Sequence, residues 1–491
     1  MNRASKRALR KKYRTLQVYG AAGVAGAAAI GVVGVTNQGT VGENAAAAST
    51  LSRLPKLASP IASPHGDPGS AANIAAQEAL HVSSVVSDAK RTFGSRYAGA
   101  WIDNSGKSPV TRIMVTGSPN ASTERLFRGR LALSVVTKTK VSYVKYSMAQ
   151  LNAYKKTIVD YVASHFKTPA YRPSGEMILY VDTKDNSVGI GLTHQDVRFL
   201  AELQKLIPSD ALRVQWISPS VRPAPTKPTL SPNAAPQPAG GPGWVPGAIR
   251  DSPTFYKAGL GVLAYNTHHQ CTSGFTLSGV YYGQRVYYGV TAGHCAFPMA
   301  KMVQWNTSSA PPYIGIGTRV WSLGTGGDYY AFVLTKPYQS SYKALGTIIA
   351  ETGHGFGFVD NVVGRVANSI FHPPGQLVCA SGYITNQVTC GDQLSGSGTD
   401  VWDGSVHKWV GNQACATYID RPGDSGGAVY VPRPGNAGLA AGIIASTGYV
   451  GYVDPFGNVS CYTTIDSVLQ GISAHNQGRP SYVVGVNGHR Y

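Results

Sequence analysis

The first 270 residues of this 491-residue chain contain no cysteine, and charged residues make up only 14% of the whole. Acidic residues are scarce, at 24 against 43 basic ones, so the formal net charge is +19. The chain has no internal repeat and no phosphate-binding glycine loop, so neither a repeat array nor a nucleotide site of that kind is expected. Glycine, at 58 residues, and proline, at 30, are frequent instead, which favours many turns over long helices.

The positive charge is unevenly distributed along the chain. Seven cationic side chains lie within the first fourteen residues, whereas residues 244–491 hold 13 basic against 11 acidic residues. The rest of the excess lies between residues 49 and 243. Because the C-terminal half is nearly neutral, it lacks the basic surface that nucleic-acid binding requires, and we expect no nucleic-acid partner.

The N-terminus has the organisation of an export signal. Residues 1–14 are strongly basic, and residues 16–35 are uncharged and mostly Ala, Gly and Val. A permanent membrane anchor is the alternative, because the run is long enough to span a bilayer, although Ala and Gly contribute little apolar transfer energy. The four alanines at 45–48 offer a cleavage site. The basic N-terminal region contains no Arg-Arg pair, so nothing indicates twin-arginine export. We expect a signal peptide over residues 1–48 and a secreted, extracellular protein without membrane contact after processing.

All the cysteines lie in the C-terminal half. They are Cys271, Cys295, Cys379, Cys390, Cys415 and Cys461. An even count confined to one region predicts disulfides within one oxidised domain, and reduced, buried thiols are the alternative. The count alone does not fix which cysteines pair.

Residues 71–217 have the pattern of a small α+β domain. A helical periodicity begins at Ser147, residues 177–181 and 188–192 form two strand patterns, and Thr193 is placed to cap a second helix. This segment has no catalytic constellation. Residues 219–246 follow with nine prolines, a composition typical of an exposed linker and a plausible place for cleavage.

From Gly259 onward the pattern changes to short runs of Val, Ile, Tyr and Thr broken by Gly, Asn and Pro. Examples are residues 285–290, 329–334 and 439–445. Many short strands at close spacing predict a barrel or a sandwich, with one helix near the end from Ile465 to about Ala474.

Three short sequences in this half carry the chemistry. They are Thr-Ala-Gly-His-Cys at 291–295, Gly-Gly-Asp-Tyr-Tyr-Ala at 326–331 and Gly-Asp-Ser-Gly-Gly at 423–427. Each alone has an ordinary explanation: a surface histidine, a turn aspartate or a tight glycine turn. Together, in the order His, Asp, Ser, they match the order of the chymotrypsin-like enzymes, which differs from that of subtilisins and α/β-hydrolases.

The residue types suit amide cleavage. A serine such as Ser425 becomes a strong nucleophile when an imidazole such as that of His294 takes its proton. A carboxylate such as Asp328 holds the imidazole tautomer and stabilises the imidazolium. The glycines around Ser425 permit a sharp turn in which the N–H groups of Gly423 and Ser425 could bind an oxyanion.

At these motifs the C-terminal half resembles the bacterial chymotrypsin-like serine proteases of the streptogrisin and α-lytic group. Residues 378–382 and 389–391 are similar to a streptogrisin disulfide loop, and residues 93–103, with Tyr-Ala-Gly-Ala-Trp at 97–101, are similar to the family's pro-region. The resemblance covers most of the chain from about residue 75.

The resemblance implies an all-β two-barrel protease domain over residues 247–491, preceded by a pro-region over residues 49–218 with an α+β core. His294 would be the general base and acid, Asp328 its orienter and Ser425 the nucleophile, with Gly423 and Ser425 forming the oxyanion hole. It also implies the disulfide pairs Cys271–Cys295, Cys379–Cys390 and Cys415–Cys461. The protein would be a monomeric zymogen acting on protein or peptide substrates, with its own pro-region as a partner and without a cofactor.

Some residues depart from or extend this pattern. Asp424 would be a buried carboxylate that needs a cation, with Arg365 as one partner. The loop of residues 416–422 is longer than the corresponding loop usually is in the family, and it would form one wall of the specificity pocket. The strand expected to line that pocket carries Ser446, Thr447 and Gly448, without charge or histidine, which favours medium or large apolar P1 residues. An inward-turned Asp420 would argue against that.

Two further interpretations concern other classes of site and function. The pair His268-His269 next to Cys271 suggests a metal, but no third and fourth ligand stands out, so we expect no metal site. The triad would also serve a secreted esterase, and a protease fold that has lost activity would be a binding protein.

Overall fold

The computed structural model describes residues 84–103, 105–106, 109–131, 138–165, 175–194, 197–216, 256–264, 270–304, 313–339, 344–351, 357–366, 373–385, 388–403, 408–418, 423–433, 437–450, 458–485 and 488–491, with a few isolated residues besides. The expected signal peptide and the proline-rich linker lie outside the described residues. The chain divides into residues 1–59 and a compact unit of residues 60–491. Within the described ranges, no helix combines the length and the hydropathy that crossing a bilayer requires.

The N-terminal part mixes helices and strands, as the sequence suggested, with one three-stranded sheet and a second group of three strands that forms one end of a larger sheet. The first sheet has the order β1 (Tyr97–Asp103), β2 (Val110–Thr116), β3 (Thr139–Val144), and α4 (Ala121–Arg128) connects the parallel pair β2 and β3. The second has β4 (Met177–Asp182), β5 (Ser187–Leu192) and β6 (Leu212–Trp216), with α7 (Val197–Leu206) connecting the parallel pair β5 and β6.

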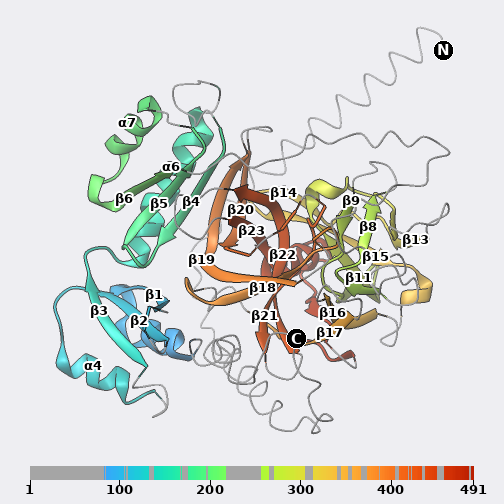
Figure 1. The fold of residues 1–491 in the computed structure, drawn as a ribbon, viewed down its shortest axis with the longest axis horizontal. Coiled ribbons are helices and arrows are strands. Elements are labelled where there is room, and N and C mark those ends of the chain that lie inside the picture. Colours follow the sequence, from blue (N-terminus) through green and yellow to red (C-terminus); the bar gives the residue numbers. More distant parts are fainter. Residues whose placement is uncertain are drawn as a thin grey trace. The chain divides into compact units, whose positions relative to one another are not determined.

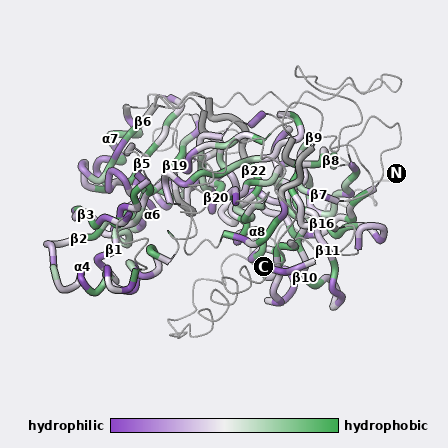
Figure 2. The backbone as a smooth tube through the Cα atoms, turned by 60° about the horizontal axis from the view of Figure 1, so that its bottom comes forward, coloured by the Kyte–Doolittle hydropathy of each residue, from purple (hydrophilic) through white to green (hydrophobic). Residues whose placement is uncertain are grey.

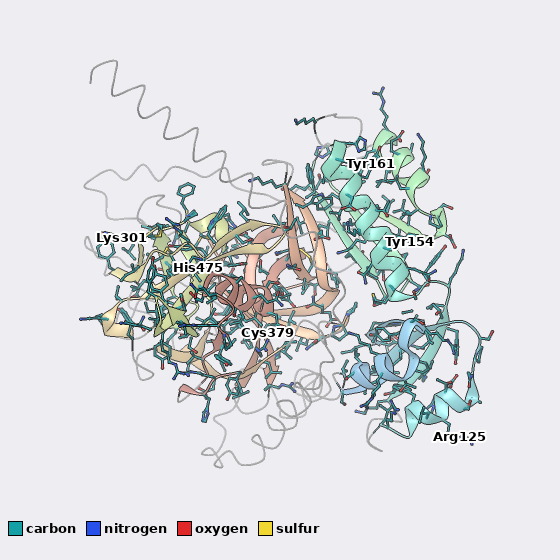
Figure 3. The ribbon with its side chains drawn as sticks, turned by 180° about the vertical axis from the view of Figure 1, so that it is seen from behind. Arg125, Tyr154, Tyr161, Lys301, Cys379 and His475 are labelled. Atoms are coloured by element: carbon teal, nitrogen blue, oxygen red, sulfur yellow. A yellow bond between two sulfur atoms is a disulfide. The ribbon has the colours of Figure 1, made fainter. Side chains whose placement is uncertain are left out.

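The long helix α6 (Met148–His165) packs on the second sheet. Tyr154 and Tyr161 lie along this helix (Figure 3) and pack against its apolar core. The α7 helix is described from Val197, and residues 195–196, where the helix that Thr193 was expected to cap would start, lie outside the described residues. The Thr193 hydroxyl accepts the Glu176 N–H at 3.0 Å and donates to the Glu176 carbonyl at 3.3 Å. In each group of three strands a helix thus connects a parallel strand pair, as in short βαβ units.

The first β-barrel is a closed ring of strands. Its strands are β8 (Gly261–Ala264), β9 (Gln270–Thr272), β10 (Leu277–Tyr281), β11 (Gln284–Thr291), β15 (Gly327–Leu334), β13 (Tyr313–Ile316) and β12 (Met302–Gln304), with β14 (Trp321–Gly324) paired to β15. Residues between β9 and β10 complete the closure: Ser273 N–H donates to the Leu260 carbonyl at 2.7 Å, and Gly274 N–H to that of Val290 at 2.7 Å. The strand runs of the sequence therefore form a barrel and not a sandwich.

The second barrel is also a closed ring. Successive pairing joins β18 (Leu377–Ser381), β19 (Val388–Asp403), β20 (Lys408–Ala416), β23 (Asn458–Thr464), β22 (Ala437–Val450) and β21 (Ala428–Arg433), which returns to β18. Strands β7 (Tyr256–Ala258), β16 (Ala344–Glu351) and β17 (Gly357–Arg365) extend this sheet beyond β22. The domain is therefore a two-barrel, chymotrypsin-like fold (Figure 1).

One helix, α8 (Ile465–His475), follows the second barrel. It buries Val468, Leu469 and Ile472 in a core shared with both barrels, and Figure 2 shows its hydrophobic residues beside those of β22. The tail then forms β24 (Tyr482–Val483), which pairs with β10 of the first barrel. The end of the chain thus packs across both barrels.

Candidate active site

The histidine motif follows directly on strand β11. Residues Gly293–Cys295 form a short 3₁₀ turn that carries His294 beside the start of β15. Gly293 is required here, because a Cβ atom on it would lie 2.0 Å from the Ser322 carbonyl oxygen. The turn is held by Trp321, whose indole N–H lies 2.8 Å from the Gly293 carbonyl.

Asp328 and His294 meet through two hydrogen bonds. Asp328 Oδ2 lies 2.6 Å from His294 Nδ1, and Asp328 Oδ1 accepts the His294 backbone N–H at 2.9 Å. The aspartate side chain is only 4% exposed and the histidine side chain 40% exposed. Because a carboxylate can only accept, Nδ1 carries the proton and Nε2 is left as the acceptor.

The serine motif lies in a sharp turn before β21. Gly423 and Gly426 have φ values of +100° and +88°, and a Cβ on Gly426 would lie 2.1 Å from the Thr291 hydroxyl oxygen. In this turn the N–H groups of Asp424, Gly426 and Gly427 donate to backbone carbonyls. Among the described residues, the N–H groups of Gly423 and Ser425 find no acceptor, so both are available to bind an oxyanion.

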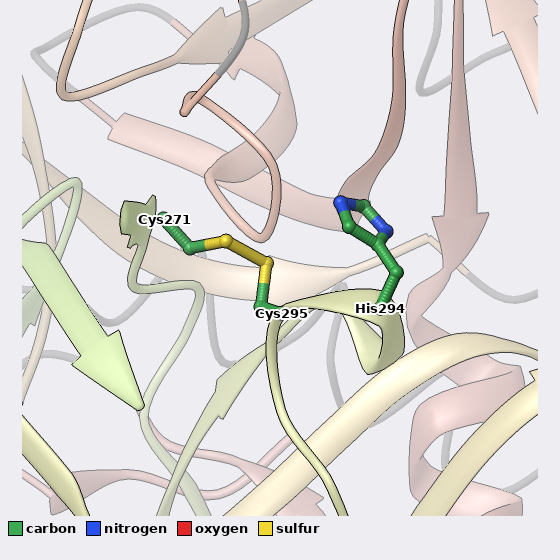
Figure 4. A group of neighbouring side chains, drawn as sticks. All are labelled: Cys271, His294 and Cys295. Atoms are coloured by element: carbon green, nitrogen blue, oxygen red, sulfur yellow. A yellow bond between two sulfur atoms is a disulfide. The ribbon is translucent and has the colours of Figure 1, made fainter. Parts of the chain in front are cut away.

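Strand β9 brings the two motifs together. Thr272 N–H donates to the Ser425 carbonyl at 2.8 Å, and the Thr272 hydroxyl donates to the Gly423 carbonyl at 2.9 Å. Its neighbour Cys271 forms a disulfide with Cys295, directly after His294 (Figure 4). Cys295 Sγ lies 3.8 Å from the Ser425 carbonyl oxygen, so the serine turn of the second barrel abuts the histidine turn of the first.

The three disulfides join the pairs that the resemblance implied. They are Cys271–Cys295, Cys379–Cys390 and Cys415–Cys461. Although Cys271, Cys295 and His294 have sulfur and nitrogen atoms within 4.8 Å of one another, a disulfide sulfur is not the thiolate that a metal requires. His268 and His269 lie outside the described residues.

Asp424 is fully buried, but its partners correct the expectation of a cation. The carboxylate accepts the N–H groups of Ile384 at 2.7 Å and Arg421 at 2.8 Å, together with the N–H and the hydroxyl of Thr385. Arg365 instead forms an ion pair with Asp466. Burial raises the pKa of Asp424, and these hydrogen bonds oppose the rise. Neutral hydrogen-bond donors therefore stabilise the carboxylate for which the sequence suggested an arginine.

The specificity wall is only partly described. Ser446, Thr447 and Gly448 belong to the backbone of β22, but their side chains lie outside the described residues. On the long loop, Tyr418 is fully buried, and Asp420 Oδ1 accepts the Ser460 hydroxyl at 2.7 Å. The Asp420 carboxylate is thus tied to the neighbouring strand β23.

Sequence reasoning missed the hydroxyl residues that hold these turns. Thr272 and Thr385 are single threonines without a motif of their own. Thr272 bonds Gly423, which is 151 positions further along the chain, and Thr385 bonds Asp424, which is 39 positions further along. A weak signal did exist for Thr272, which directly follows the cysteine that the resemblance paired with Cys295.

No protein-family model and no curated protein matches the chain. Solved structures similar to it include a serine protease described as glutamic acid specific and as using a histidine triad in substrate binding (23% identity, 46% of this chain and 100% of that one, TM-score 0.34). Others are the Nocardiopsis protease (22%, 44% and 96%, TM-score 0.33) and the Cellulomonas bogoriensis chymotrypsin (22%, 46% and 96%, TM-score 0.32). At these scores the assignment of the fold rests on the two closed barrels themselves.

Proposed function

We propose that the chain is a secreted serine endopeptidase that works through His294, Asp328 and Ser425. The observation that carries the proposal is the 2.6 Å contact of buried Asp328 with His294. It lies next to a serine turn in which the N–H groups of Gly423 and Ser425 have no acceptor among the described residues. The three disulfides fit an oxidising, extracellular compartment.

The proposed reaction follows from the tautomer that Asp328 selects. His294 Nε2 takes the proton of the Ser425 hydroxyl as its oxygen attacks the scissile carbonyl carbon. The oxyanion that forms accepts the N–H groups of Gly423 and Ser425. The imidazolium then gives its proton to the leaving amine, and the C–N bond breaks to leave an acyl-enzyme. Water repeats the sequence, with His294 again as base, and frees Ser425.

A fluorophosphonate probe tests this function on the purified, processed protein. A triad predicts a covalent adduct on Ser425, whereas a non-catalytic binding protein would leave that serine unmodified. Hydrolysis of casein then separates an endopeptidase from an esterase, which would cleave only ester substrates. Absence of both the adduct and casein cleavage would reject the proposal.

We further propose that the N-terminal segment is a pro-region that assists folding and inhibits the protease domain. Strand β4 of the N-terminal segment pairs with β19, and this pairing extends the sheet of the second barrel. Near it, Lys155 Nζ on α6 lies 2.8 Å from Asp400 Oδ2 on β19. Trp402 and Trp409 of the β19–β20 hairpin are buried in the core that α6, α7 and the second sheet form. A barrel dominated by long-range strand pairs folds slowly, so a partner that binds its hairpin early would help.

Refolding tests these two roles. Residues 244–491 should regain little activity alone and more when residues 71–217 are added as a separate chain. Equal recovery would exclude the folding role, and failure of the added segment to inhibit the active protein would exclude the inhibitory one.

For the substrate we propose medium or large apolar P1 residues. The support is the uncharged sequence at 446–448 and the hydrogen bond that ties Asp420 to Ser460. A peptide-library profile dominated by Arg or Lys at P1 would overturn this proposal.

A further inference from the structure

Asp328 is held from the opposite barrel by one threonine. Thr463 is fully buried in β23 of the second barrel, whereas Asp328 is the second residue of β15 in the first. The Thr463 hydroxyl accepts the Asp328 backbone N–H at 2.9 Å and donates to the Asp328 carbonyl at 3.1 Å. A single side chain therefore satisfies both main-chain polar groups of the aspartate that bonds His294.

The orientation of this hydroxyl is itself fixed. Gln413, buried in β20, lies directly opposite Thr463 and donates its Nε2–H to Thr463 Oγ1 at 2.9 Å. A hydroxyl oxygen has two acceptor positions and one proton. Because Gln413 and the Asp328 N–H fill the acceptor positions, the proton is directed to the Asp328 carbonyl. The adjacent disulfide Cys415–Cys461 joins the same two strands and maintains this register.

The glycine before the aspartate makes the approach possible. Gly327 has a φ of +111°, and a Cβ on it would lie 2.7 Å from Thr463 Cγ2. Any side chain at this position would push Thr463 away from Asp328. Gly327 of the aspartate motif thus serves the contact between the barrels as well as the turn.

The aspartate carboxylate depends on this support. Within the described residues its hydrogen bonds come only from His294, through the backbone N–H and Nδ1. Among these described donors none approaches the carboxylate from the second barrel, so the contact of Thr463 with the Asp328 main chain is the described link that holds the carboxylate from that side. We propose that Thr463, supported by Gln413, is a positioning residue that aims the Asp328 carboxylate at His294 Nδ1 across the interface of the barrels. This inference rests on the proposed function of the triad.

The test compares Thr463→Val, which keeps the shape and removes the hydroxyl, with Thr464→Val. Thr464 is the adjacent buried threonine, and its hydroxyl bonds Ser467 of α8 instead of Asp328. Thr463→Val should move upfield or broaden the ¹H NMR resonance of the His294 Nδ1 proton, and it should lower kcat by roughly 10 to 10²-fold with little change in KM. Thr463→Ser should restore both properties, and Thr464→Val should leave both unchanged.

The two readouts separate this inference from the proposed function. If the wild-type protein cleaves no substrate, the function fails, but the proton resonance still reports on the contact. If the wild type is active and Thr463→Val matches Thr464→Val in resonance and kcat, the positioning role is overturned. Should Thr463→Val not accumulate as folded protein, Gln413→Leu removes the supporting donor. It should shift the resonance in the same direction by a smaller amount, and an unchanged resonance would equally overturn the role.

Discussion

Asp328 accepts both the backbone N–H and the ring Nδ1 of His294, at 2.9 and 2.6 Å. The two bonds fix the histidine at its main chain and at its ring, so the imidazole has one orientation relative to the carboxylate. The exposed fraction of the histidine, 40%, leaves its other edge open to a substrate.

Asp328→Asn should lower kcat by about 10⁴, because an amide in place of the carboxylate favours the wrong imidazole tautomer. The barrel and the disulfides should survive the change. The matched control is Asp360→Asn on β17, whose backbone pairs with Ile348. Peptide hydrolysis at saturating substrate measures both variants, and near-wild-type activity of Asp328→Asn would assign the orienting role to another aspartate.

Gly423→Ala should reduce kcat by roughly 10² to 10³, the effect of losing one oxyanion donor. The new Cβ would lie 2.6 Å from Ile384 Cγ1, at a φ of +100°, so the turn has to shift. Gly478→Ala is the control, because Gly478 has a φ of +79° but open space around it. Similar kcat values for the two variants would argue against an oxyanion role for the turn.

Thr385→Val should make the stability of the protein more sensitive to pH. The lost hydroxyl stabilised the ionised Asp424, so the already raised pKa of this buried carboxyl rises further. In the unfolded chain the Asp424 carboxyl ionises near its ordinary pKa of 3.8, whereas in the folded protein it ionises only at higher pH. The cost to the free energy of unfolding therefore appears as the pH rises through the folded pKa. Urea unfolding should show a small deficit at pH 4 and about 1.5–3 kcal/mol at pH 7. Thr385→Ser keeps the hydroxyl, so its free energy of unfolding should match that of the wild type at both pH values. A deficit of Thr385→Val that is equal at pH 4 and pH 7 would contradict the account.

Lys155→Met should weaken inhibition by the separately added N-terminal segment by about 10²-fold, because it leaves the largely buried Asp400 without its cation. The neighbouring variant Lys156→Met removes an exposed lysine whose partner is Asp160 on the same helix. That pair is worth little, so the inhibition constant should not change. Equal inhibition constants for the two variants would show that the contact between Lys155 and Asp400 does not contribute to the affinity of the segment for the protease domain.

The sequence predicted the parts of this protein that depend on local pattern. The helix beginning near Ser147 follows from apolar periodicity, and the three motifs follow from residue types and their order. The pairing of β4 with β19 could not be predicted, because it joins segments more than two hundred residues apart. The partner of Asp424 was wrong for a related reason: charge suggested Arg365, whereas the fold supplies N–H groups of a loop. Thr463 gives no local signal, since its role depends on an aspartate in the other barrel.

The most direct test of the account is the kcat of Ser425→Ala for a peptide substrate, measured on processed protein with its three disulfides intact. The account predicts a loss of roughly 10⁶-fold against wild type, because His294 then has no hydroxyl to deprotonate. A variant that retains more than about a tenth of wild-type activity would contradict the assignment of Ser425 as nucleophile, and with it the proposed mechanism.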